Sequence, residues 1–394
     1  MKKFYDMMFT RKPSNLGRQI ELDIAKALCI FFMVMLHIFE DIYLVGGTPA
    51  NAFGNFLMYY LAGFTGAGTF MLCMGLGFGY TKHSKPKDFI KRGAIIFALS
   101  YVLNFVRSFT FIFFYFPQID PEVGSFMTAY GLLNVDIMQF AGLALMVFGL
   151  FQLMKMKPWH MFVVAFSLSL ASSLFILLHG QVTTGSIVGD GLLSLLFPMW
   201  FLIDDGQHYV SFFPLVCYLI FPIAGYCMSY YYKRLKNKTM FFGIALLLTL
   251  IAIVSYVLIN PIEKQAGLFR EYDIGYYHIY TWDALINIVT STGLIGLCYF
   301  VSLILPKFIL NGCHEISKNI NKIYCISWVI LLNGIGIYFS SMLRRGSPTP
   351  ETYPDWLIAV LGIVVFAISA LIAHYYAQII ELLKDKKKVN KKRA

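Results

Sequence analysis

Ten apolar segments, each long enough to cross a lipid bilayer, follow one another along the 394 residues of this chain. A spanning helix needs about 20 mainly apolar residues, and inside a bilayer its backbone polar groups must be hydrogen-bonded within the protein. With 58% hydrophobic and only 13% charged residues, the composition excludes a soluble fold. We therefore predict an all-α polytopic integral membrane protein, with one bundle of ten transmembrane helices at 20–45, 53–80, 89–116, 132–154, 159–178, 209–232, 240–259, 282–305, 323–343 and 356–383.

Basic residues are concentrated in alternate connections between these segments. Loops after the even-numbered segments are rich in Lys and Arg, whereas most loops after odd-numbered ones are acidic; the last, with Arg344 and Arg345, is the exception. The positive-inside rule then places both termini in the cytoplasm. The net charge of +11 accordingly indicates topology and lipid headgroups, not a nucleic-acid partner. The predicted divisions are a basic cytoplasmic N-terminus (1–19), a transmembrane domain (20–383) and a basic cytoplasmic tail (384–394).

Three local features refine this prediction. The apolar stretch 192–203 is too short to span and lies in a long polar connection, so we expect a re-entrant or interfacial helix there. Pro214 and Pro222 predict a kink in the sixth span. The first apolar segment has no small-residue cleavage site, so we expect it to be retained as a spanning helix. The seven cysteines lack metal-ligand spacing and predict neither a metal site nor disulfides.

The first span carries ionisable residues on one face. Lys26 and His37 are eleven positions apart, about three turns, and Asp23 lies within roughly 40° of the same face. Asp41 follows His37 by one turn, and Glu40 precedes Asp41. Ionisable groups inside a spanning helix are costly and usually mark a functional site. The alternative is a charged cap at each end of an ordinary span, with Lys26 reaching the headgroups.

Polar residues on other spans fall at the same predicted depth as His37. The third span rises outward, and the fourth and eighth descend from outside, so their polar positions meet near the outer surface. Arg107 is the most informative of these residues, because a cation so far into a span needs a partner of opposite charge. Asp136 and the carboxylates of the first span are the candidates. We predict an outer cavity for an acceptor substrate, lined by Asn104, Arg107, Asp136, Gln139, Asp283 and Asn287.

The first span resembles the opening of the membrane acyltransferase superfamily, which includes the acyltransferase-3 family and relatives of heparan-alpha-glucosaminide N-acetyltransferase. The additional Asp four residues after the His is similar to a bacterial branch of the latter group. This chain has Lys26 where the family usually has Arg, and Ala27 where that branch usually has Gly; Lys lacks the planar fork for bidentate binding. The matching residues are Glu21-Leu22-Asp23, Lys26, His37 and Asp41, with weaker similarity at Gly68–Gly75 and Ser211–Leu215.

The resemblance implies transfer of an acyl group, in the first place acetyl, from cytoplasmic acyl-CoA to a hydroxyl or amine of a glycan-type acceptor outside a bacterial cell membrane. His37 would be the catalytic base or carry the acyl group itself, with Asp41 or Glu40 fixing its tautomer. Acyl-CoA is then a substrate, and no bound cofactor or metal is expected. The candidates for holding the acyl-CoA phosphates are Asp23, Lys26, Lys91 and Arg92.

Two other classes of protein remain open from the sequence. Intramembrane His, Asp and Arg also serve as proton relays, as in a secondary transporter or flippase of a polar or amphiphilic solute. The chain lacks a clear inverted repeat of interrupted helices, which transporters often have. A non-catalytic scaffold would leave the buried polar groups unexplained. The sequence does not identify the acceptor or the acyl chain, and it leaves a homo-oligomer open.

Overall fold

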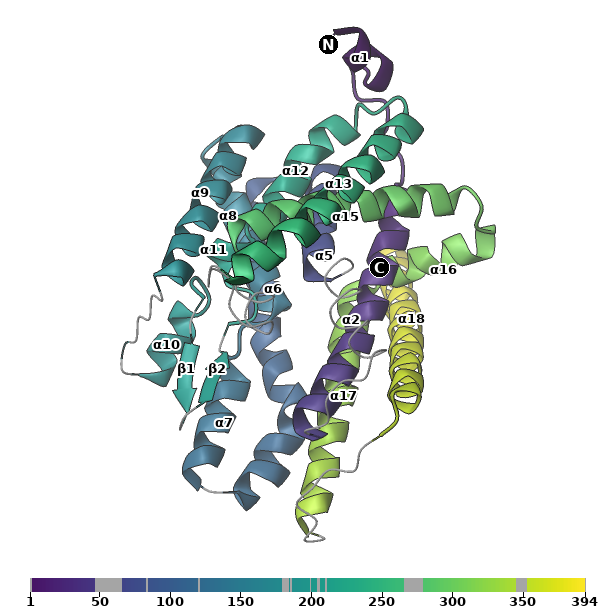
Figure 1. Cartoon of the computed structure of the whole chain (residues 1–394). Coiled ribbons are helices and arrows are strands. Elements are labelled where there is room, and N and C mark those ends of the chain that lie inside the picture. Colours follow the sequence, from purple (N-terminus) through teal and green to yellow (C-terminus); the bar gives the residue numbers. More distant parts are fainter. Residues whose placement is uncertain are drawn as a thin grey trace.

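Long apolar helices packed side by side make up most of the protein, as the computed structural model shows (Figure 1). The structure describes residues 2–46, 66–82, 84–119, 121–178, 184, 186–198, 200–203, 206–209, 211–265, 279–344 and 353–393. Its elements in chain order are α1 (Lys2–Met8), α2 (Ile20–Gly46), α5 (Ala67–Tyr80), α6 (Pro86–Arg107), the π-helix η2 (Phe111–Tyr115), the 3₁₀ helix η3 (Phe116–Gln118), α7 (Pro121–Leu133), α8 (Ile137–Leu153), α9 (Pro158–Leu177), α10 (Ile187–Leu193), β1 (Trp200–Ile203), β2 (Gly206–Tyr209), α11 (Leu215–Tyr218), α12 (Ile220–Tyr232), α13 (Lys238–Gln265), α15 (Thr281–Ser302), α16 (Lys307–Lys318), α17 (Ile320–Arg344) and α18 (Asp355–Arg393).

Eight helical segments within the described residues are long and apolar enough to cross a membrane. The shorter apolar helices α5 and α8 coincide with the two remaining predicted spans. Residues 53–65, the first half of the second predicted span, lie outside the described residues. The prediction of a polytopic, helical membrane protein is confirmed.

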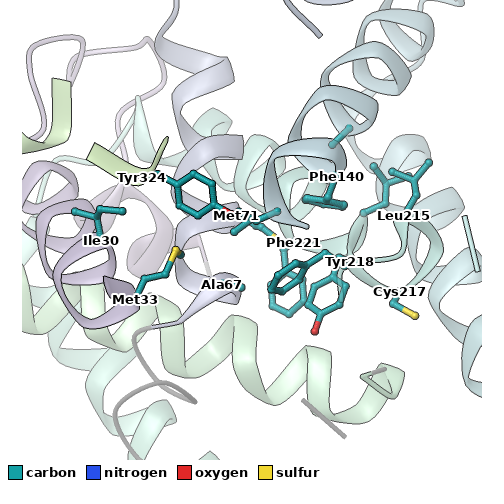
Figure 2. Packing of buried hydrophobic residues seen from close by; sticks show 14 of the residues in the cluster. Ile30, Met33, Ala67, Met71, Phe140, Leu215, Cys217, Tyr218, Phe221 and Tyr324 are labelled. Atoms are coloured by element: carbon teal, nitrogen blue, oxygen red, sulfur yellow. The ribbon is translucent and has the colours of Figure 1, made fainter. Parts of the chain in front are cut away.

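The apolar core joins helices that are far apart in the sequence. Helix α2 packs against α5, α15, α17 and α18, while α6 packs against α8 and α5 against α12. In Figure 2, Ile30 and Met33 of α2 lie to one side of Met71 of α5, and Phe221 and Phe140 lie to the other. The basic N-terminal end and the β1–β2 hairpin lie at opposite ends of the bundle (Figure 1).

The region around 192–203 differs from the prediction. The structure has the short helix α10 at Ile187–Leu193, and then an antiparallel hairpin in which Trp200 pairs with Tyr209. Pro198 has no backbone N–H to donate and does not continue a helix in this stretch, a signal that apolar length alone overlooks. The sixth span therefore begins at Leu215 and not at Tyr209.

Two further elements refine the sequence-based boundaries. The sixth span is divided at Leu219, between α11 and α12. Pro222, which has no N–H to donate to the carbonyl of residue 218, explains this break. The segment of α16 was expected to be a basic loop, yet it forms an amphipathic helix that lies against the start of α2 and the middle of α18 (Figure 1).

Glycines of α5 allow backbone contact with neighbouring helices. A Cβ added at Gly75 would collide with the backbone carbonyl of Pro222 in α12, and one added at Gly225 of α12 with the carbonyl of Leu72. Gly77, two residues along α5, has open space at the corresponding position. The α5–α12 contact thus depends on Gly75, as expected for small residues between membrane helices.

We expect Gly75→Ala to destabilise the protein by about 1–3 kcal/mol, because the added methyl group forces α5 and α12 apart. Gly77→Ala is the matched control and should be neutral or slightly stabilising, since alanine favours a helix by about 0.5–1 kcal/mol over glycine. Unfolding in detergent micelles measures both. Equal midpoints for the two variants would contradict the contact.

Candidate functional site

His37 of α2 stacks on Trp328 of α17. The two ring centroids are 4.1 Å apart and the rings are inclined by 30°. His37 is half-buried, about 16 Å along the helix from Lys26 at roughly 1.5 Å per residue. The helices α2 and α17 pack directly against each other. The imidazole therefore lies at the contact between two spans.

A buried ion pair lies beside this ring stack. Arg107 at the end of α6 donates from Nη1 to Oδ2 of Asp136 at 2.7 Å, and the two side chains are only 5% and 9% exposed. The hydroxyl of Tyr324 donates to the same Oδ2 at 2.6 Å. The guanidinium carbon of Arg107 lies 4.9 Å from the centroid of the Trp328 ring, a cation–π distance. Both charges act electrostatically on His37.

Asp136 uses its two carboxylate oxygens for different purposes. It is the N-cap residue of α8, where Oδ1 accepts from the backbone N–H of Ile137 at 2.6 Å. The side chain of Gln139 accepts from the backbone N–H of Asp136 at 3.1 Å, which completes a capping box. Oδ2 remains directed at Arg107 and Tyr324. The start of α8 therefore holds the carboxylate in place for the ion pair.

Two residues predicted to line the acceptor cavity bind carbonyl groups of the loop between α7 and α8. Asn104 Nδ2 donates to the carbonyls of Leu132 and Asn134 at 3.0 and 2.8 Å, and Gln139 Nε2 donates to the carbonyl of Asn134 at 3.2 Å. Both amides are buried. Their contacts place them behind Asp136, as supports of the loop that carries it.

The predicted positions on α15 lie at a different contact. Asn287 Oδ1 accepts from Ser291 at 3.1 Å and lies directly against Gly68 of α5. Asp283 is half-buried near the start of the helix. Asn287 therefore belongs to the contact between α5 and α15.

The carboxylates that follow His37 are described only in part. Glu40 is half-buried in α2. Asp41 belongs to the same helix, but its side chain lies outside the described part of the structure. Asp136 lies beside the His37 stack through its ion pair with Arg107, which contacts the Trp328 ring.

The inner end of α2 carries a second group of charges. Asp23 Oδ2 accepts from Arg18 Nε at 2.7 Å and lies 3.1 Å from Nδ1 of His314 in α16. Burial raises the pKa of the Cys313 thiol, and the Asp23 carboxylate adds to this rise. Lys26 is half-buried one turn further along α2.

The other two residues predicted to bind the acyl-CoA phosphates do not join the charged group around Asp23. Lys91 and Arg92 are exposed on the first turns of α6. Within the described residues, no hydrogen bond or ion pair joins them to Asp23, whose partners are Arg18 and His314.

Sequence reasoning missed the contribution of α17 to the site. Tyr324 and Trp328 are one turn apart, which puts them on one helix face, but aromatic residues are frequent throughout this chain and do not stand out. The spacing itself is the one available signal. The helix contributes the hydroxyl that binds Asp136 and the ring that contacts both His37 and Arg107.

The arrangement fits proton transfer or nucleophilic chemistry at one imidazole. His37 is held by ring stacking, and the buried Arg107–Asp136 ion pair, whose charges cancel in sum, provides fixed charges beside it. Buried ion pairs of this kind are costly unless further hydrogen bonds satisfy them, and Tyr324 supplies one. Ionisable groups inside a span have a high free-energy cost and therefore indicate a functional site.

Comparison with known proteins identifies the family. A family model described as an acyltransferase domain, of the acyltransferase-3 type, matches residues 19–375. No curated protein and no solved structure matched the chain. The match covers nearly all of the chain, including every residue of the His37 site. The chain therefore belongs to the acyltransferase-3 family and is a membrane acyltransferase.

Proposed function

We propose that this acyltransferase moves an acyl group, acetyl in the first place, from cytoplasmic acyl-CoA to a hydroxyl or amine of an extracytoplasmic, glycan-type acceptor. His37 is the reacting residue, as base or as acyl carrier. We place the protein in a bacterial plasma membrane, within the branch related to heparan-alpha-glucosaminide N-acetyltransferase. The observation that supports this most is the stacking of His37 on Trp328 beside the buried Arg107–Asp136 pair.

In direct transfer, a ring nitrogen of His37 takes the proton of the acceptor hydroxyl or amine as its oxygen or nitrogen attacks the thioester carbonyl. The carbon–sulfur bond breaks, and the coenzyme A thiolate leaves and takes up a proton. Histidine suits this role because its pKa normally lies near working pH. The carboxylate of Asp136, which pairs with Arg107 beside the Trp328 ring on which His37 stacks, would stabilise the imidazolium that forms.

In the acyl-carrier route, the neutral ring nitrogen of His37 attacks the thioester and coenzyme A leaves as the thiolate. The acyl-imidazole then reacts with the acceptor, and the ring is regenerated. This route separates donor and acceptor in time, which suits substrates that approach from opposite membrane surfaces.

The inner end of α2 supports a donor site. Lys26 is half-buried on the face that leads to His37, and Arg18 and His314 both contact Asp23 one turn before it. We propose that Lys26 binds the coenzyme A phosphates, and that Lys91 and Arg92, exposed near the same end of the bundle, add to the cationic surface. Lys26→Arg should keep activity if Lys26 acts as a cation alone.

Purified protein in nanodiscs, incubated with acetyl-labelled acetyl-CoA, tests the proposal. Without an acceptor, label on the protein that is lost in His37→Ala would identify the acyl-carrier route. With a set of glycan acceptors, release of coenzyme A and label on the acceptor would identify direct transfer or the complete reaction. Neither release nor transfer, together with uptake of a solute by proteoliposomes, would favour the transporter alternative.

The orientation gives a separate prediction. In a chain whose seven native cysteines are replaced, a cysteine at Ser125 of α7 should react with an impermeant thiol reagent in intact cells. One at Lys236, between α12 and α13, should react only after lysis. Both positions are exposed on the protein surface. Labelling at Lys236 in intact cells would overturn the proposed topology.

A further inference from the structure

The chain that carries Arg107 departs from regular helix immediately after this residue. Helix α6 ends at Arg107, and the π-helix η2 begins at Phe111. In a regular α-helix the N–H of residue i donates to the carbonyl of residue i−4, so the N–H of Thr110 would donate to the carbonyl of Val106. Arg107 lies within the turn that this bond would close.

The carboxamide of Asn333 in α17 takes both halves of this bond. Its Oδ1 accepts from the N–H of Thr110 at 3.1 Å, and its Nδ2 donates to the carbonyl of Val106 at 2.9 Å. The backbone carbonyl of Asn333 also accepts from the hydroxyl of Thr110 at 3.1 Å. A side chain inserted into the hydrogen-bond ladder is a recognised cause of helix bending, and π-type turns frequently occur at functional sites.

Close approach of the two helices makes this insertion possible. A Cβ at Gly336, one turn after Asn333, would collide with the hydroxyl of Thr110, and it would also lie 3.1 Å from the backbone N of Phe111. The glycine thus lets α17 contact the backbone of the joint between α6 and η2. The same helix holds Asp136 through Tyr324 and contacts the guanidinium of Arg107 through Trp328.

We propose that Asn333 is a positioning residue for Arg107. By replacing the Val106–Thr110 hydrogen bond, its carboxamide sets the direction in which Arg107 leaves the helix, toward Asp136 and Trp328. The importance of this for acyl transfer rests on the function proposed above. The effect of Asn333 on the placement of Arg107 does not depend on that function, because it can be measured without turnover.

The test uses Asn333→Leu, which keeps the number and branching of the side-chain heavy atoms and has no hydrogen-bonding groups. Ser340→Ala is the control on the same helix, because Ser340 is a buried polar residue of α17 whose hydroxyl donates within that helix, to the carbonyl of Gly336 at 2.7 Å. The full chain is labelled with 5-fluorotryptophan, and Trp328→Phe assigns the fluorine resonance of Trp328. Transfer from acetyl-CoA is measured on the same samples.

In Asn333→Leu the Val106–Thr110 bond closes and Arg107 turns away from Trp328. We expect the Trp328 resonance to shift, kcat to fall by about 10–100-fold and KM for acetyl-CoA to stay within about twofold, since a misplacement of about 1 Å can cost 10²-fold in rate. Ser340→Ala should change none of these. In an Arg107→Gln background, Asn333→Leu should cause no further shift.

An unshifted Trp328 resonance would overturn the proposal, even if transfer were lost. An equal shift in the Arg107→Gln background would do so as well, because Asn333 would then act on Trp328 directly. If neither Asn333→Leu nor Asn333→Ala folded, the residue would be structural and the proposal wrong. If the parent protein showed no transfer and Asn333→Leu still shifted the Trp328 resonance, the positioning role would be supported and the proposed function refuted.

Discussion

Replacing His37 with alanine is expected to lower acyl transfer by about 10²–10⁴-fold, the usual cost of losing a general base. A larger loss is expected if the imidazole carries the acyl group, because alanine has no nitrogen that can form the bond to the acyl carbon. The variant should insert and bind acyl-CoA, because it removes a polar group from a span and leaves the inner end of α2 unchanged. Labelled acetyl-CoA measures both binding and transfer.

The chain offers a matched control for this variant. His160 also lies against a tryptophan ring, with its centroid 3.8 Å from that of Trp159, but at the start of α9 and remote in sequence from the Arg107–Asp136 pair. His160→Ala should leave transfer unchanged. Folded His37→Ala protein with near-normal transfer would show that the His37 stack is structural, and the reacting group would have to be sought elsewhere.

The second large effect is expected at Asp136. Asn is as good an N-cap as Asp, so Asp136→Asn keeps the start of α8 while it removes the charge that pairs with Arg107. Breaking a buried ion pair from one side costs about 3–5 kcal/mol, because the remaining charge is left without compensation. We expect a loss of stability of that order in micelle unfolding, together with a severe loss of transfer.

Combining Asp136→Asn with Arg107→Gln separates the two effects. Two neutral amides in place of the ion pair should restore most of the stability, since replacing both partners removes the uncompensated charge. Transfer should stay low, because the fixed charges beside His37 are absent. If Asp136→Asn alone were as stable as the parent protein, the ion pair would not be the element that holds α6 to α8 at this depth.

Apolar length predicted the long helices, of which eight within the described residues are long and apolar enough to cross a membrane. The failures occurred where length carries no information. Helix α16 has only 12 residues and its Lys, His and Glu resemble a solvated loop, so its amphipathic character was hidden by its charge. The 192–203 stretch ends in the strand β1, which pairs with β2, and apolar length does not distinguish such a strand from a short helix.

The sequence predicted that the residues of the candidate site lie at a common level along their helices. It did not predict the direction in which each side chain leaves its helix. The sequence places Arg107, Asp136 and His37 at one level of the membrane, but it left the partner of Arg107 open between Asp136 and the carboxylates of the first span. The choice depends on the direction of Arg107 from its helix, which in the structure involves Asn333 more than 200 residues later. A contact of that kind has no local sequence signal.

The ion pair between α6 and α8 has a consequence for how the protein is made. Asp136 follows Arg107 by 29 residues, so the α6 segment reaches the membrane before its counter-charge has been synthesised. A central arginine costs about 2.5–3.5 kcal/mol on insertion scales. The spanning segment that begins with α6 continues to Gln118, so Arg107 enters the bilayer within it and not at its end. Entry of α6 and α8 as one hairpin then neutralises the cation as it is buried, which ties the biogenesis of the bundle to the assembly of its reactive centre.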